Sequence, residues 1–388
     1  MRTPEEDVLL LSMRRQFTSD HLRQLRTLLS KELDWDYVIA LADHHGVTGI
    51  IYENLNTYFG DLIPEAHRAA LQNQFETVKM TNLILVTELR QTLRLFAAEG
   101  IAAVPLKGPL LALMIYDNPV WRECSDLDIL VRKEQLATAQ QLLESVGYET
   151  IDLAKRKPRG LKVAIEEDYH VSLKHSRSSI VIELHWSVVT TPSLFEIDIQ
   201  TFWTNLTTFT SAGISFLTPR PEDLLLILAV HGVKHRWYQL KWLYDIEQFI
   251  YRHQGIDWNK LLCKAQHAGV RRIVLLNLWM AYSLLQVELP DDILAFIESD
   301  EVIKPGSAYI SAWIFSGAKS WIDRAKSELF CVDAWESFEK KTVYICSYAL
   351  ASASSKESAP LRVFWGYITA NAIWLAAIIY RHLKRLFV

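Results

Sequence analysis

The amino-acid sequence predicts an α+β protein in which a compact α/β unit lies between two helical regions. Apolar residues recur at three- and four-residue spacing through residues 1–100 and again through residues 219–388, a pattern typical of amphipathic helices. Residues 101–218 instead alternate short apolar runs with helical segments. Because no evident linker or low-complexity tract separates the three parts, we expect both helical regions to pack onto the α/β unit.

The N-terminal region carries the helical pattern in three segments, Asp20–Lys31, Trp35–His45 and Pro64–Glu99. Within the third, the apolar spacing continues without a break from Phe75 to Ala98, which predicts one long amphipathic helix packed on the following unit.

The α/β unit is predicted from its alternation of patterns. A proline at position 109 suits a first helical turn, and Gly147 is placed to stop a helix. Two alternating runs around the polar turn SRSS predict a β-hairpin. The expected order is strand 101–106, helix 107–116, strand 126–131, helix 133–146, strand 148–153, and hairpin strands 169–175 and 180–186.

The C-terminal region begins with Pro219 and Pro221, which are helix-start signals. The helical pattern then runs through residues 221–251 and is repeated in 257–290 and 300–388.

Composition limits the classes of function. Lys plus Arg (41) nearly balances Asp plus Glu (45), and the formal charge of -4 argues against binding nucleic acid through a broad basic face. The four cysteines contain no C-x-x-C pair, and the N-terminus has acids where a secretion signal needs basic residues. We therefore expect a cytoplasmic protein without disulfides or a zinc knuckle.

Residues 363–380 form an uncharged run that is followed by the basic sequence RHLKR. Eighteen residues lie near the lower limit for crossing a bilayer. We expect a helix packed on the protein body, with membrane contact peripheral if it exists; a spanning helix is the alternative.

The chemistry-bearing motif is Asp126-Leu-Asp128 at the start of a predicted strand. Side chains two residues apart share one face of a strand, so the two carboxylates project together. Two acids this close favour a divalent cation between them, with Mg²⁺ the usual one. Glu183 on a neighbouring strand is the expected third acid, and His185 lies on the same face as Glu183.

Phosphate-binding groups are predicted just before these acids. Lys107 and Gly108 follow a strand and open a helix, where backbone N–H groups and the helix dipole favour anions. Arg122 lies four residues before Asp126 and is expected to reach phosphate oxygens.

His231, Lys234 and His235 fall within about one helical turn, and on a continuous helix Asp245 would return to the same side. Three interpretations remain open. The group forms a second wall of the site that contacts acceptor or nucleotide, a zinc-binding histidine pair, or a structural network between helix and sheet.

These motifs together resemble a known family. The stretch from Lys107-Gly108 through Arg122 to Asp126-Leu-Asp128 is similar to bacterial uncharacterised nucleotidyltransferases (NTP transferase family 5) of the DNA polymerase beta-like superfamily. Glu183-Leu-His185-Trp186 and the later His231–His235 segment are also similar to that family. The turn that is glycine–serine or glycine–glycine in the superfamily is Lys107–Gly108 here.

The resemblance implies a polymerase beta-like core and transfer of a nucleoside monophosphate from a nucleoside triphosphate, with Mg²⁺ or Mn²⁺, to an unidentified small-molecule, sugar, peptide or protein acceptor. One alternative is a catalytically silent nucleotide-binding or scaffold module. Another, which rests only on residues 363–380 and is compatible with the enzyme, is a membrane-associated partner in envelope or polysaccharide assembly. The implied metal ligands and catalytic residues are Asp126, Asp128 and Glu183, and the implied nucleotide-binding residues are Lys107, Gly108, Arg122 and Ser125.

Overall fold

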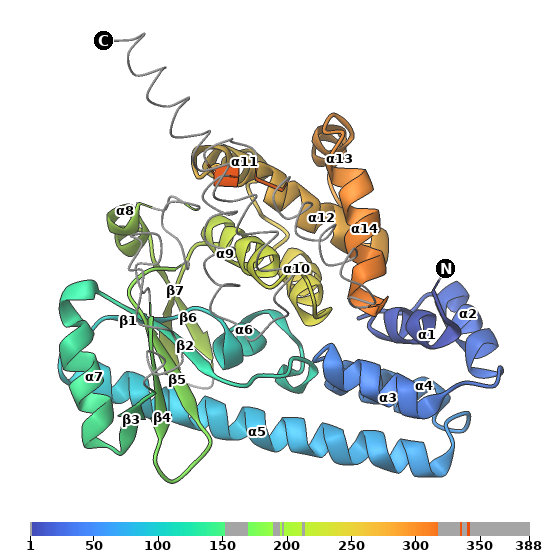
Figure 1. Ribbon diagram of the computed structural model, residues 1–388, viewed down its shortest axis with the longest axis horizontal. Helices are drawn as coiled ribbons and strands as arrows, with labels where there is room; N and C mark the ends of the chain where they lie inside the picture. The colour runs from blue at the N-terminus through green and yellow to red at the C-terminus, as the bar shows by residue number, and fades with distance from the viewer. Residues whose placement is uncertain are drawn as a thin grey trace, which may run out of the picture.

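The computed structural model describes residues 2–151, 170–188, 195, 198–211, 214–316, 334–335 and 340–341. It confirms an α+β fold, in which long helical segments surround a small mixed sheet (Figure 1). The predicted helix at residues 363–380 lies outside the described residues. Among the helices within these ranges, none has the length and apolar character needed to cross a bilayer.

The N-terminal region forms five helices: α1 (Pro4–Ser12), α2 (Ser19–Leu29), α3 (Trp35–His44), α4 (Thr48–Phe59) and α5 (Glu65–Ala98). Helix α5 confirms the predicted long helix and begins ten residues earlier than the segment from Phe75. It runs along the bottom of the molecule in Figure 1, from the N-terminal helices to the sheet. Its buried side includes Leu85, Leu89 and Phe96, which join the main hydrophobic core.

The α/β unit comprises β1 (Ala103–Pro105), α6 (Gly108–Ile115), the short 3₁₀ helix η1 (Pro119–Trp121), β2 (Leu127–Val131), the 3₁₀ turn η2 (Lys133–Gln135), α7 (Leu136–Ser145), β3 (Tyr148–Thr150), β4 (His170–His175) and β5 (Val181–His185). All five predicted strands are present. They form one sheet in the order β1-β2-β5-β4-β3. The hairpin prediction is confirmed, because β4 and β5 pair antiparallel, whereas β2 and β5 run parallel.

A further helix and a second hairpin were not predicted: α8 (Ile199–Thr204), β6 (Thr207–Ser211) and β7 (Ile214–Thr218). The helices after them are α9 (Pro221–Lys234), α10 (Lys241–Arg252), α11 (Trp258–His267), α12 (Arg271–Leu285), α13 (Asp291–Glu298) and α14 (Ile303–Ser316).

One continuous hydrophobic core joins the three parts of the chain. It contains Val8 and Met13 near the N-terminus, Ile129 in the sheet, and Tyr244 and Leu276 in the later helices, all less than 2% exposed. Burial of this kind is the main favourable contribution to folding, so the sheet is held by helices that precede it and helices that follow it in the sequence.

Candidate active site

The predicted carboxylates meet on two neighbouring strands. Asp128 in β2 lies directly opposite Glu183 in the parallel strand β5. His185, two residues beyond Glu183, places its Nε2 2.9 Å from Asp128 Oδ1 and 3.4 Å from Glu183 Oε2. One potential ligand atom from each of the three residues lies within 4.8 Å of the others. The parallel register thus brings together residues 57 positions apart as a potential cation site.

Asp126 lies just before β2 and is half-buried next to this group. Burial and the negative charge of Asp128 raise the pKa of Asp126, and Glu183 adds to the rise while Lys107 opposes it. The charge of Asp126 is therefore electrostatically coupled to the charges of Asp128 and Glu183. However, the compact set consists of Asp128, Glu183 and His185, so His185 takes the place predicted for Asp126. Ser125 is exposed beside it.

Lys107 reaches the same carboxylate from the turn before α6. Its ammonium Nζ lies 3.2 Å from Asp128 Oδ2 and 3.2 Å from His231 Nδ1. A lysine ammonium has only donors, so His231 Nδ1 accepts this hydrogen bond and is unprotonated. Burial, followed by the Lys107 charge, holds the pKa of His231 well below its usual value, which agrees with a neutral ring.

Gly108 allows the turn to sit this close to the acids. Its φ of +62° is in the left-handed region, and a Cβ atom there would lie 3.0 Å from the backbone oxygen of Asp126. The backbone N–H of Leu106 also donates to the Asp128 carbonyl at 3.0 Å. A side chain at position 108 would therefore strain the turn and push it away from the D-x-D segment.

The pKa values within the cluster depend on its internal contacts. Burial would raise the pKa of Asp128, but Lys107 and the hydrogen bond to His185 outweigh it and hold that pKa well below its usual range. Burial would likewise lower the pKa of His185, but its hydrogen bonds to Asp128 and Glu183 outweigh burial and raise it. An ionised Asp128 that is paired with the Lys107 ammonium and hydrogen-bonded to His185 avoids the cost of an unpaired buried charge.

The segment that contains His231 and His235 lies partly against this cluster. The helical pattern through residues 221–251 predicted one continuous helix, and this is wrong, because α9 ends at Lys234 and α10 begins at Lys241. Trp237, in between, has a φ of 49° and is fully buried. His231 contacts Lys107, whereas the His235 ring packs 4.9 Å from the Trp242 ring. Among described residues, the histidine pair is not part of any metal-compatible cluster, which argues against the zinc interpretation.

Arg122 and Asp245 do not lie where the sequence analysis had expected them. Arg122 Nε and Nη2 donate to the two Asp245 oxygens at 2.7 and 3.0 Å, and Tyr116 donates its hydroxyl to the same carboxylate at 2.8 Å. Arg122 is 5% exposed and Asp245 1%. The Arg122 guanidinium, which was predicted to bind phosphate, is therefore hydrogen-bonded to the buried Asp245 carboxylate. Asp245 ties α10 to the loop before β2, and it does not join His231 on one helix face.

The donor set around Asp128 fits a divalent cation. Carboxylate oxygens are the ligands that Mg²⁺ and Mn²⁺ favour, and Asp128, Glu183 and the adjacent Asp126 supply them. The imidazole of His185 is a ligand better suited to softer divalent ions than to Mg²⁺. Its hydrogen bonds to both acids also match the role of a residue that orients metal-binding carboxylates.

Comparison with known proteins places this geometry in a family. The profile of a family described as uncharacterised nucleotidyltransferases matches residues 31–286, which is well over half of the chain and includes every residue of the candidate active site. No curated protein matches the chain.

Three solved structures are distantly similar. The solution structure of the antibiotic-resistance factor ANT(2'')-Ia has 12% identity and a TM-score of 0.34, with 48% of this chain and 92% of that chain covered. A crystal structure of ANT(2'')-Ia with adenylyl-2''-tobramycin has 12% identity and a TM-score of 0.31, covering 47% and 95%. A nucleotidyltransferase-like protein from Paracoccidioides brasiliensis has 16% identity and a TM-score of 0.29, covering 54% and 93%. On the strength of the family match, the resemblance seen in the sequence is confirmed, and the chain belongs to this family of uncharacterised nucleotidyltransferases.

Proposed function

We propose that this protein is a divalent-metal-dependent enzyme that moves a nucleoside monophosphate from a nucleoside triphosphate to a small-molecule, sugar, peptide or protein acceptor. The observation that carries the proposal is the pairing of Asp128 with Glu183 across parallel strands, with Lys107 3.2 Å from the Asp128 carboxylate. Family membership supplies the class of reaction.

Asp128 and Glu183, with Asp126 beside them, are the residues proposed to hold Mg²⁺ or Mn²⁺. Such an ion would neutralise phosphate charge and stabilise the leaving pyrophosphate. His185 keeps the two carboxylates oriented through its 2.9 and 3.4 Å contacts.

Lys107 is the proposed triphosphate-binding cation. Its side chain is 13% exposed, so it lies at the edge of the buried cluster with its charge directed at the acids. Lys107 is also the N-cap residue of α6, whose first backbone N–H groups have no partner within the helix. The lysine and the helix start together offer donors to phosphate oxygens.

Of the two carboxylates paired across the strands, Glu183 is the better placed to receive a proton from an acceptor hydroxyl. Its side chain is 26% exposed, compared with 8% for Asp128. Burial would raise the pKa of Glu183, but the hydrogen bond to His185 outweighs burial and lowers it. The carboxylate is therefore ionised at neutral pH and accessible to an acceptor.

Labelled triphosphates test the proposal. Purified protein is incubated with each of the four nucleoside triphosphates, labelled at the α- or the γ-phosphate, with Mg²⁺ or Mn²⁺ and a small-molecule extract. We expect transfer of the α-label with release of pyrophosphate. Asp128→Asn should abolish the transfer. Asp300→Asn, which alters an acid paired with Arg272 at 2.7 Å outside the site, should retain it.

Three results would contradict the proposal. Transfer of the γ-label would indicate a phosphoryl transferase. Tight binding of a triphosphate with no turnover on any acceptor, water included, would favour the silent nucleotide-binding module. Near-wild-type turnover by Asp128→Asn would remove the carboxylate cluster from the mechanism.

A further inference from the structure

A pocket of about 520 Å³ lies far from the carboxylates, between α1, α2 and the C-terminal end of α12. In Figure 1 these N-terminal helices lie at the opposite side of the molecule from the sheet. The floor of the pocket is apolar and is formed by four leucines, Leu10, Leu11, Leu28 and Leu284. Its volume is in the range of sites that hold small organic molecules.

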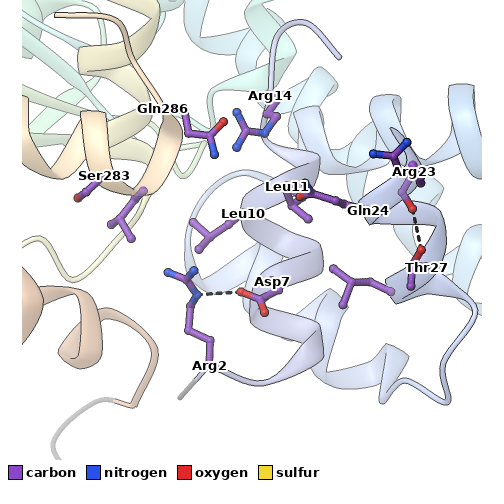
Figure 2. Close-up of a pocket in the computed structure, with 12 residues that line it drawn as sticks. Arg2, Asp7, Leu10, Leu11, Arg14, Arg23, Gln24, Thr27, Ser283 and Gln286 are labelled. Atoms are coloured by element: carbon purple, nitrogen blue, oxygen red, sulfur yellow. Dashed lines mark hydrogen bonds and ion pairs between the residues drawn. The ribbon is translucent and has the colours of Figure 1, made fainter. Parts of the chain in front are cut away.

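Arg14 gives the pocket a buried cation. The residue is 8% exposed, and no described group accepts a hydrogen bond from its Nε. Figure 2 shows its guanidinium directed across the pocket toward Gln286 at the end of α12. The backbone is fixed, because Asn54 donates through Nδ2 to the carbonyls of Ser12 and Arg14 at 2.7 and 2.8 Å. A buried cation with an unused donor on a fixed backbone favours an anionic partner.

No described carboxylate within 4.0 Å balances Arg14. Its electrostatic counterpart is Glu247 in α10, but burial raises the pKa of Glu247 to about 8, against the opposing effects of Arg14 and Arg15. Glu247 is thus largely protonated at neutral pH, and its charge does not cancel that of Arg14.

Two further arginines line the rim. Arg2 is paired with Asp7 at 2.8 Å, and Arg23 is paired with Asp20. All four of these side chains are well exposed, and exposed ion pairs are weak and exchange readily. The rim arginines are therefore available to a ligand that also contacts Arg14.

We propose that this pocket binds an amphipathic organic anion, with a carboxylate or phosphate-ester head on Arg14 and an apolar tail on the leucine floor. Guanidinium groups bind both kinds of head through paired hydrogen bonds. The family match begins at residue 31, so α1 and α2, which supply most of the lining, precede it. The site is therefore a feature of this chain's N-terminal helices and does not depend on the proposed transfer reaction.

Calorimetric titration of the full chain tests the proposal with octanoate, octyl phosphate, octanol and inorganic phosphate. We expect one or both octyl anions to bind at least about tenfold more tightly than octanol and inorganic phosphate, because only they satisfy both the arginine and the leucines. A preference for octanoate identifies a carboxylate ligand, and a preference for octyl phosphate identifies a phosphate ester.

Variants locate the binding. Arg14→Gln should weaken the preferred anion about tenfold or more, as expected for loss of a charge-assisted hydrogen bond. Thr27→Glu adds an acid at the exposed rim without disturbing the core and should also weaken binding, which keeps the test valid if Arg14→Gln does not fold. Arg26→Gln removes an arginine that lies in α2 next to Thr27 but does not line the pocket, and it should change affinity less than about twofold. Equal binding of octanol, no binding of either anion, or unchanged affinity in Thr27→Glu would overturn the proposal.

Discussion

The Arg122–Asp245 pair gives the most quantitative prediction. Replacing Asp245 with Asn keeps the shape of the side chain but removes the negative charge that accepts two hydrogen bonds from Arg122 and one from Tyr116. Because Arg122 is 5% exposed, water cannot take over the lost partner. Breaking a buried pair in this way typically costs about 3–5 kcal/mol.

Removing both charges should cost less than removing one. In the double variant Arg122→Met/Asp245→Leu no unpaired charge is left behind, and replacing a buried ion pair with apolar residues is often nearly neutral. Tyr116→Phe removes only one hydrogen bond to a charged acceptor, so we expect it to lower the free energy of unfolding by about 1.5–3 kcal/mol.

Urea unfolding followed by circular dichroism measures these free energies, with Asp300→Asn as the matched change in a more exposed ion pair. The expected order of destabilisation is Asp245→Asn first, then Tyr116→Phe, with the double variant well below Asp245→Asn. A cost below about 1 kcal/mol for Asp245→Asn, the range of a surface pair, would refute the argument from burial. So would a double variant that is less stable than Asp245→Asn.

Three other changes follow from the site and its surroundings. Asp126→Asn should abolish α-label transfer while leaving the thermal midpoint unchanged or slightly raised, since it relieves repulsion from Asp128; a fall of the midpoint comparable to that of Asp245→Asn would contradict this. Lys107→Ala should weaken binding of a non-hydrolysable triphosphate by about 1–3 kcal/mol in calorimetry, and unchanged affinity would remove Lys107 from the phosphate site. Glu247 has a folded-state pKa raised from 4.5 to about 8, so the folded chain holds a proton that the unfolded chain releases, and the free energy of unfolding should fall as pH rises between these values. Urea unfolding of Glu247→Gln should lack this fall, which is worth about 1.4 kcal/mol per pKa unit, and an identical pH profile would disprove it.

Local patterns predicted most of the sheet. The helix–strand alternation located all five strands of the main sheet within one to three residues, and the turn at SRSS predicted the β4–β5 hairpin. The period of two also put Glu183 and His185 on one face, where both contact Asp128 or its ion-pair partners. These features depend on neighbours in sequence, which is why sequence alone was sufficient.

The features that the sequence did not predict depend on contacts between residues far apart in the sequence. The helix expected to continue past Lys234 breaks because Trp237 turns inward and donates its indole N–H to Asn277 at 2.8 Å, a partner 40 residues away. Arg122 was expected near phosphate because it lies four residues from Asp126, but its partner Asp245 is 123 residues away in sequence. Such long-range partners cannot be predicted from spacing, because spacing relates only residues that are close along the chain.

Long-range partners also determine the charges at the site, which the D-x-D motif alone does not predict. The D-x-D motif predicts two acids that repel until a cation binds, and for Asp126 the raised pKa agrees with that repulsion. For Asp128 a cation is already present in the protein, Lys107 from the turn before α6, and His185 from β5 adds a hydrogen bond. A divalent ion at Asp128 must therefore compete with these two partners, whereas at Asp126 it only relieves repulsion. The two aspartates belong to one motif, yet Asp128 is also ion-paired with Lys107 and hydrogen-bonded to His185 in the folded chain, so its loss should reduce stability as well as activity.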